Sequence, residues 1–267
     1  MLVSHESPIS ILDKSKQYND YCYALVHLFE THPEYYNHFK LSLAQDREVL
    51  LDNSIFELGE SFNPTKYAKY VEELKPTFYI VPDVLENSTG TMTSFEMFVN
   101  NFPNLESLKI GVVQGKTWQE LVDCYRFMDK HADYIAISFD YSWYDTVTYS
   151  PRYGRLGQLD RWAAGRSYFI KRLRSEGIWN NNKPHHLLGC SLAHEFRDYK
   201  DIPSIRSCDT SNPVVAALHD HRYIAEYGLT HKPSTLLADL INHNVNSDEM
   251  EMIKYNTSQF KKIISNG

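Results

Sequence analysis

Short apolar runs alternate with longer amphipathic stretches through the middle of this chain. An apolar run of about four to eight residues that ends in polar residues is typical of a strand buried on both faces. Such runs predict strands at residues 47–54, 77–83, 108–115, 134–140, 185–191 and 205–209.

The stretches between and after these runs predict helices. In residues 63–75, apolar side chains recur at helical spacing after an Asn-Pro pair, and that pair is typical of a helix N-terminus. We expect the other helices at residues 117–131, from Pro213 towards Tyr227, and from about Asp248 to Ile264.

Strands that alternate with helices predict a parallel sheet covered by helices, which is the α/β class. For 267 residues the favoured solution is a (β/α)8 TIM-type barrel forming one domain over residues 1–267, and an open doubly wound sheet is the alternative. Residues 1–46 must then supply the remaining strands. Their segment YCYALVHLF is ambiguous between strand and helix.

Composition narrows the class of protein. The formal net charge is -7, so any polyanionic partner needs a local basic patch. No apolar stretch is long enough for a membrane span, and the N-terminus lacks the pattern of a signal peptide. The cysteines show no CxxC pairing, which argues against a zinc ribbon or a disulfide framework. We therefore expect a cytoplasmic protein that does not bind membranes.

Polar residues stand where several predicted strands end. Asp52, Asp83 and Gln114 are evenly spaced along the chain, one strand and one helix apart, and Asp209 ends the last strand. The carboxyl ends of barrel strands open on one face, so we expect these residues, with Gly189 and residues 138–140, to converge on one pocket. Taken singly, each aspartate is more typical of a helix cap.

Five segments in this order resemble the tRNA-guanine transglycosylase superfamily, over roughly residues 47–215. Members of that family exchange guanine in a polynucleotide for a 7-deazaguanine base, and their fold is a (β/α)8 barrel. The segments are LLDNSIFELGE, VPDVLE, GVVQGK, HLLGCS and SCDTSN.

The resemblance implies two catalytic aspartates. Asp209 lies at the position of the family's nucleophile, which attacks the sugar C1′ and displaces guanine. Asp52 lies at the position of the family's second aspartate, which handles the proton of the departing or incoming base. A carboxylate suits the first role because it can capture an oxocarbenium-like carbon covalently.

The resemblance also implies a base-binding set. Phe56 and Leu188 would stack on the two faces of the base, while Asp83 and Gln114 would read its guanine-like edge. The whole set is Asn53, Phe56, Asp83, Gln114, Leu188 and Gly189.

The chain departs from the family's tRNA enzymes in two ways. It lacks their C-terminal CxCxxC zinc pattern, so we expect no zinc subdomain, metal or cofactor; the histidines of HDH (219–221) carry no further ligand pattern. It also lacks the arginine-bearing turn that follows the nucleophile. Both differences favour the DNA-modifying branch, known from phages and bacterial genomic islands, which inserts a base such as preQ0 into DNA.

A basic segment occupies an apparent insertion around residues 141–183. Arginines there are interleaved with Tyr153 and other aromatic residues, a mixture that suits a nucleic-acid backbone and splayed bases. A solvated helix face is the alternative. The predicted backbone contacts are Arg152, Arg155, Arg161, Arg166 and Arg172.

Alternative functions stay open at this stage. The substrate could be tRNA, or the same two aspartates could serve a nucleic-acid N-glycosidase that uses water. A non-catalytic subunit of the same fold and an unrelated sugar-processing barrel are further alternatives. The sequence also leaves open a homodimer and the need for a partner protein.

Overall fold

The computed structural model describes residues 1–152 and 154–266, so Tyr153 of the basic segment lies outside the described residues. The chain divides into two compact units. Unit 1 comprises residues 1–20, 138–181 and 187–267, and unit 2 comprises residues 21–137 and 182–186. The single domain expected from the sequence stays a prediction.

The strands of the described chain form one eight-stranded sheet, in the order β1-β10-β9-β6-β5-β4-β3-β2, and a separate two-stranded hairpin. With helices between these strands, the α/β class is confirmed, and the strand order is compatible with a (β/α)8 barrel. The strands are β1 (Leu2–Ser4), β2 (Cys22–Leu25), β3 (Val49–Asp52), β4 (Phe78–Ile80), β5 (Leu108–Val113), β6 (Tyr134–Ser138), β9 (His185–Leu188) and β10 (Ile205–Asp209).

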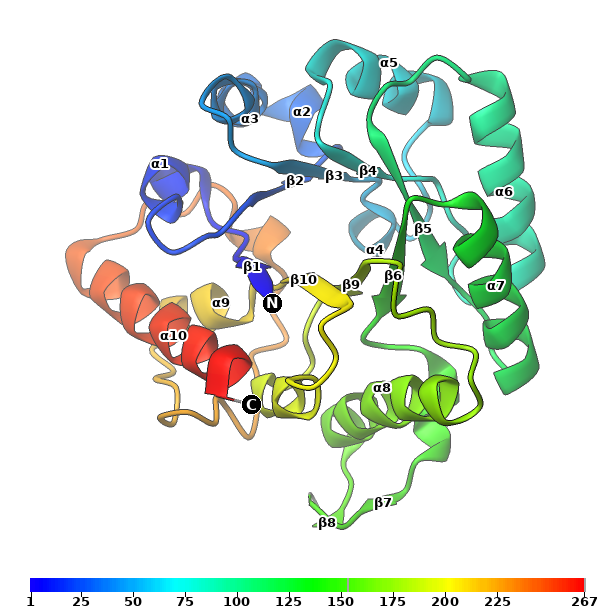
Figure 1. Cartoon of the computed structure of the whole chain (residues 1–267). Helices are drawn as coiled ribbons and strands as arrows, with labels where there is room; N and C mark the ends of the chain where they lie inside the picture. Colours follow the sequence, from blue (N-terminus) through cyan, green and yellow to red (C-terminus); the bar gives the residue numbers. More distant parts are fainter. Residues whose placement is uncertain (153, 267) are drawn as a thin grey trace. The chain divides into compact units, whose positions relative to one another are not determined.

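Unit 2 contains a run of parallel strand pairs from β2 to β6 (Figure 1). Its residues pair in register, for example Leu25 with Asp52 and Ile80 with Ile110. Because the strands are parallel, their carboxyl ends lie at the same edge of the sheet. The helices of this unit are α2 (Leu28–Thr31), α3 (Pro33–Ala44), α4 (Ile55–Leu58), α5 (Pro64–Leu74), α6 (Ser88–Asn101) and α7 (Trp118–His131).

Local sequence explains where the two helices expected in this unit begin. At α5 the Asn63 side chain accepts a hydrogen bond from the backbone N–H of Lys66, and Pro64 fills the first turn. At α7, Thr117 and Glu120 form a reciprocal capping box. Both helices lie where the sequence predicted them.

Unit 1 pairs the first strand of the chain with the last strand of the sheet, since β1 and β10 are parallel with Leu2 opposite Ser207 (Figure 1). Helix α10 packs against α9, and residues of both helices share an apolar core with Ile11 and Tyr18. The other elements are η1 (Ile9–Ile11), α1 (Leu12–Ser15), η2 (Ser142–Thr146), the hairpin β7 (Tyr149–Ser150) and β8 (Gly154–Arg155), α8 (Gln158–Ser175), η3 (Ala193–Asp198), α9 (Asn212–Leu218), η4 (Leu237–Leu240) and α10 (Ser247–Asn266).

The structure corrects one element and settles another. The helix expected from Pro213 towards Tyr227 ends at Leu218, and Asp220 follows with a left-handed φ of 57° that a helix cannot continue through. The ambiguous segment YCYALVHLF is strand β2 followed by the short helix α2. None of the described helices is both long and apolar enough to cross a membrane.

Candidate functional site

A buried polar cluster in unit 2 unites three of the predicted base-binding residues. The side-chain amide of Asn53 donates to Oδ1 of Asp83 over 2.7 Å, and that of Gln114 donates to Oδ2 over 2.8 Å. All three side chains are buried. They come from the carboxyl ends of neighbouring strands, so the parallel order of β3, β4 and β5 brings them together.

Further contacts fix the orientation of this cluster. The Ser61 hydroxyl donates to the carbonyl of Asp83 and accepts from its N–H, at 2.7 and 3.1 Å. The side-chain oxygen of Gln114 accepts from the N–H of Glu86 at 2.9 Å, so its amide nitrogen must face Asp83. Burial raises the pKa of Asp83, and the hydrogen bonds from Asn53 and Gln114 oppose that rise.

Asp52 and Phe56 lie around the turn that follows β3. Oδ2 of Asp52 accepts from the N–H of Ser54 at 2.8 Å, so this aspartate also fulfils the structural role of a turn-forming side chain. Ser54 adopts a left-handed conformation with φ of 60°, which is uncommon outside glycine. Phe56, on α4, is 48% exposed, which leaves its ring accessible to a stacking partner.

Asp209 and Gly189 meet in unit 1. The N–H of Gly189 donates to both carboxylate oxygens of Asp209 at 3.3 Å. Gly189 has a left-handed φ of 62°, and a Cβ there would lie 2.5 Å from Cδ1 of Phe139. Only glycine therefore fits this turn without strain, and the turn presents its amide to the buried Asp209.

Arg166 is fully buried, so the prediction that it contacts a nucleic-acid backbone is wrong. Its guanidinium donates to the carbonyl oxygens of Leu188 and Gly189 at 2.9 and 3.1 Å. It also forms a forked pair with Glu195, at 2.5 and 3.1 Å, and the Tyr199 hydroxyl donates to the same carboxylate. Arg166 thus holds the turn whose amide contacts Asp209.

Glu195 completes this buried pair. Burial raises the pKa of Glu195, and the neighbouring guanidinium opposes that rise. For Arg166, burial acts to lower the pKa, but Glu195, Tyr199 and Tyr144 together raise it above its ordinary value. Each partner therefore favours the charged form of the other.

The other four predicted arginines lie closer to the surface. Arg161 and Arg172 pair with Asp145 and Glu176 at 3.2 and 2.7 Å. Arg152 pairs with Asp198, and Arg155 is exposed on strand β8 of the hairpin. Their role in nucleic-acid binding stays a prediction.

The predicted site residues divide between the two units. Unit 2 holds Asp52, Asn53, Phe56, Asp83 and Gln114, whereas unit 1 holds Leu188, Gly189 and Asp209. Their convergence on one pocket therefore stays a prediction.

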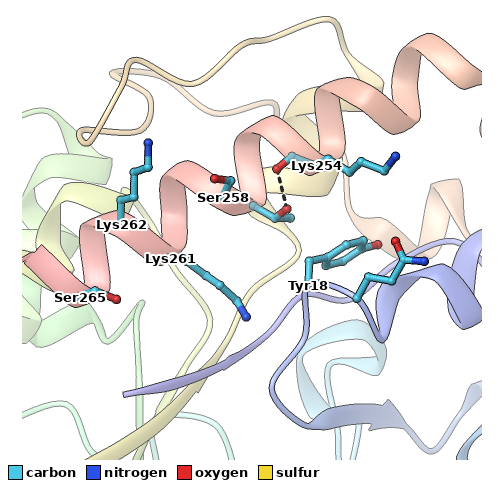
Figure 2. A pocket seen from close by; sticks show the side chains of 8 residues that line it. Tyr18, Lys254, Ser258, Lys261, Lys262 and Ser265 are labelled. Carbon is cyan, nitrogen blue, oxygen red and sulfur yellow. Dashed lines mark hydrogen bonds between the residues drawn. The ribbon is translucent and has the colours of Figure 1, made fainter.

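A hollow in unit 1 contains none of these predicted residues. Lys254, Lys261 and Lys262 of helix α10 line this hollow together with Tyr18 (Figure 2). Two of these lysines are already paired, Lys261 with Asp20 and Lys254 with Glu251, both at 2.7 Å.

Within residues 1–152 and 154–266, no three His, Cys, Asp or Glu side chains are grouped to hold a metal ion. The two neighbouring histidines of β9 pack in the interior of unit 2, where His185 bonds to the Tyr125 hydroxyl at 2.8 Å and His186 stacks on Tyr23.

The sequence patterns did not mark three residues that contact these clusters: Ser61, Glu195 and Lys232. Ser61 and Lys232 lie in irregular segments that have no periodicity to mark them. A weak signal surrounds Arg166, because the small residues of AAGRS indicate a helix face in close contact with its neighbours.

Comparisons with known proteins identify no family for this chain. No protein-family model matches the sequence, and a search of the curated proteins finds no match.

Proposed function

We propose that this protein is a base-exchange transglycosylase that replaces guanine in a polynucleotide, with DNA favoured, by a 7-deazaguanine such as preQ0. The proposal includes closure of the sheet into a (β/α)8 barrel and a cytoplasmic site of action. The observation that carries it is the state of Asp83, a buried carboxylate held by the two amides of Asn53 and Gln114.

The Asp83 cluster suits recognition of a guanine-like edge. A carboxylate has about four lone-pair positions, of which the two amides use two. The remaining two can accept from N1–H and from the exocyclic amine of guanine, a pair of donors that pyrimidines do not offer. Phe56 supplies an accessible aromatic face for stacking on the base.

The covalent step is assigned to Asp209. A carboxylate oxygen attacks the sugar C1′, and the C1′–N9 bond to guanine breaks as the aspartyl-sugar ester forms. The departing guanine takes a proton from Asp52. The incoming base then loses a proton to Asp52 and attacks C1′, which releases the Asp209 carboxylate and retains the configuration of the sugar.

A base-exchange assay tests the proposal. The protein is incubated with radiolabelled guanine or preQ0 and with either duplex DNA or unmodified tRNA. We expect label in DNA, and we expect Asp209→Asn to abolish its uptake while the exposed-aspartate control Asp201→Asn keeps it.

Each other outcome identifies an alternative. Label in tRNA alone would keep the mechanism and overturn the choice of substrate. Release of free guanine without uptake would indicate an N-glycosidase. Full exchange by Asp209→Asn would refute the covalent role of Asp209, and complete inactivity of the unaltered protein would favour a non-catalytic subunit.

A further inference from the structure

Lys232 is bound to the turn that contacts Asp209. Its ammonium nitrogen donates to the carbonyl of Cys190 at 3.2 Å and lies 4.8 Å from the centre of the Phe139 ring. Cys190 directly follows Gly189, whose amide contacts Asp209. All of these residues belong to unit 1.

The ammonium group has capacity for further acceptors. Lysine has three N–H donors, and among the described residues the ammonium of Lys232 has one acceptor, the Cys190 carbonyl. Burial lowers the pKa of Lys232, Cys190 and Asp140 oppose that change, and the positive charge of Arg166 adds to it. A half-buried ammonium with spare donors is stabilised when an anion binds beside it.

Two buried neutral donors of unit 1 have no hydrogen-bond partner among the described residues. The Ser191 hydroxyl, which follows Cys190, and the indole N–H of Trp162 are buried and have no hydrogen-bond partner within the part of the chain that the structure describes. Trp162 packs edge-on against Phe139, with ring centres 5.7 Å apart. Phe139 thus connects Trp162 to Lys232.

We propose that Lys232 binds a phosphodiester oxygen of the polynucleotide beside the nucleoside that reacts at Asp209. The inference rests on the proposed function and deepens it by naming a phosphate contact. A compact ammonium with unused donors suits a phosphate oxygen, which it binds as a point charge.

The experiment combines a change in the protein with a change in the substrate. Exchange is measured with Lys232→Met and with an oligonucleotide carrying one neutral methylphosphonate linkage, placed in turn on each side of the exchanged guanine. If the Lys232–phosphate bond exists, either change alone raises KM roughly 10- to 100-fold, because a charged hydrogen bond is lost. Both changes together raise it no further.

Controls separate this contact from general effects. Lys200→Met removes an exposed lysine elsewhere in unit 1 and should leave KM within about twofold of the unaltered protein. Lys232→Arg keeps the charge and should recover part of the loss. Urea unfolding confirms that Lys232→Met is folded.

The outcomes decide both proposals separately. Multiplicative effects of the two changes, at both linkages, would overturn the role of Lys232 while base exchange itself stood. If the unaltered protein exchanges no base, the proposed function fails, and fluorescence anisotropy with the same oligonucleotides replaces kinetics. Coupling between Lys232 and one linkage in that binding assay would keep the phosphate contact, and its absence, or no binding at all, would refute it.

Discussion

Replacing Arg166 by Met removes the guanidinium that holds the Gly189 turn. The variant leaves the Glu195 carboxylate buried with the Tyr199 hydroxyl and without its cation. It also removes the donors to the carbonyls of Leu188 and Gly189. Removing one partner of a buried ion pair costs about 3–5 kcal/mol, and we expect Arg166→Met to lower the free energy of unfolding by that amount.

Urea unfolding followed by tryptophan fluorescence measures this change well, because Trp143, Trp162 and Trp179 all belong to unit 1. The double variant Arg166→Met with Glu195→Gln should recover part of the loss, since no buried charge remains. Arg161→Met on the same helix loses a partly exposed pair and should cost about 1 kcal/mol or less.

A loss below about 1 kcal/mol in Arg166→Met would contradict the reasoning. So would a double variant that is less stable than Arg166→Met, because the cost is attributed to the uncompensated Glu195 carboxylate. A variant that remains folded should also lose kcat more than it raises KM, since the turn no longer directs its amide to Asp209.

Three further predictions concern single residues. Gly189→Ala should lower the free energy of unfolding by about 2–4 kcal/mol, because its Cβ meets Phe139 in a left-handed backbone; a thermal midpoint within 1 °C of the unaltered protein would refute this. Asp83→Asn should weaken the preference for guanine over other bases. Because burial raises the pKa of Asp83 above 3.8, the unaltered protein should lose stability as pH rises above 3.8, and Asp83→Asn should not show this loss. Urea midpoints from pH 3 to 7 measure the difference, and an equal slope in both proteins would contradict it. Burial lowers the pKa of His5 from 6.5 to about 3, so stability is present above pH 6.5 and lost on acidification towards pH 3, by about 1.4 kcal/mol per pH unit. His5→Gln should remove this slope, and an equal slope in both proteins would exclude His5 as its source.

The sequence predicted most of the sheet because buried strands and amphipathic helices leave different periods. Each of the six predicted strand segments contains a strand, and the expected helices at residues 63–75 and 117–131 are α5 and α7. The first strands were harder to find. Strand β1 has three residues, too few to show a period. Only Val26 and His27 separate β2 from α2, and neither is the Gly or Pro that would mark the boundary between them.

The polar clusters were predictable only in part. Asp83 and Gln114 end apolar strands, so their position at one sheet edge could be inferred from the parallel order. Arg166 could not, because a buried arginine and an exposed one share the same helical pattern; its burial depends on Glu195, which lies in a 3-10 helix outside any predicted element. Lys232 depends likewise on a carbonyl 42 residues away in sequence.

The pairing of β1 with β10 has a consequence for synthesis on the ribosome. Leu2 lies opposite Ser207, so strand β1 must wait for β10, the last strand of the sheet in chain order. At about 5–20 residues per second, that wait is roughly 10–40 seconds. Strands β3 to β6 each pair with the strand translated just before them, so residues 21–137 can order themselves while β1 is still unpaired. Strand β1 is therefore the strand that stays exposed longest to chaperones and proteases during synthesis.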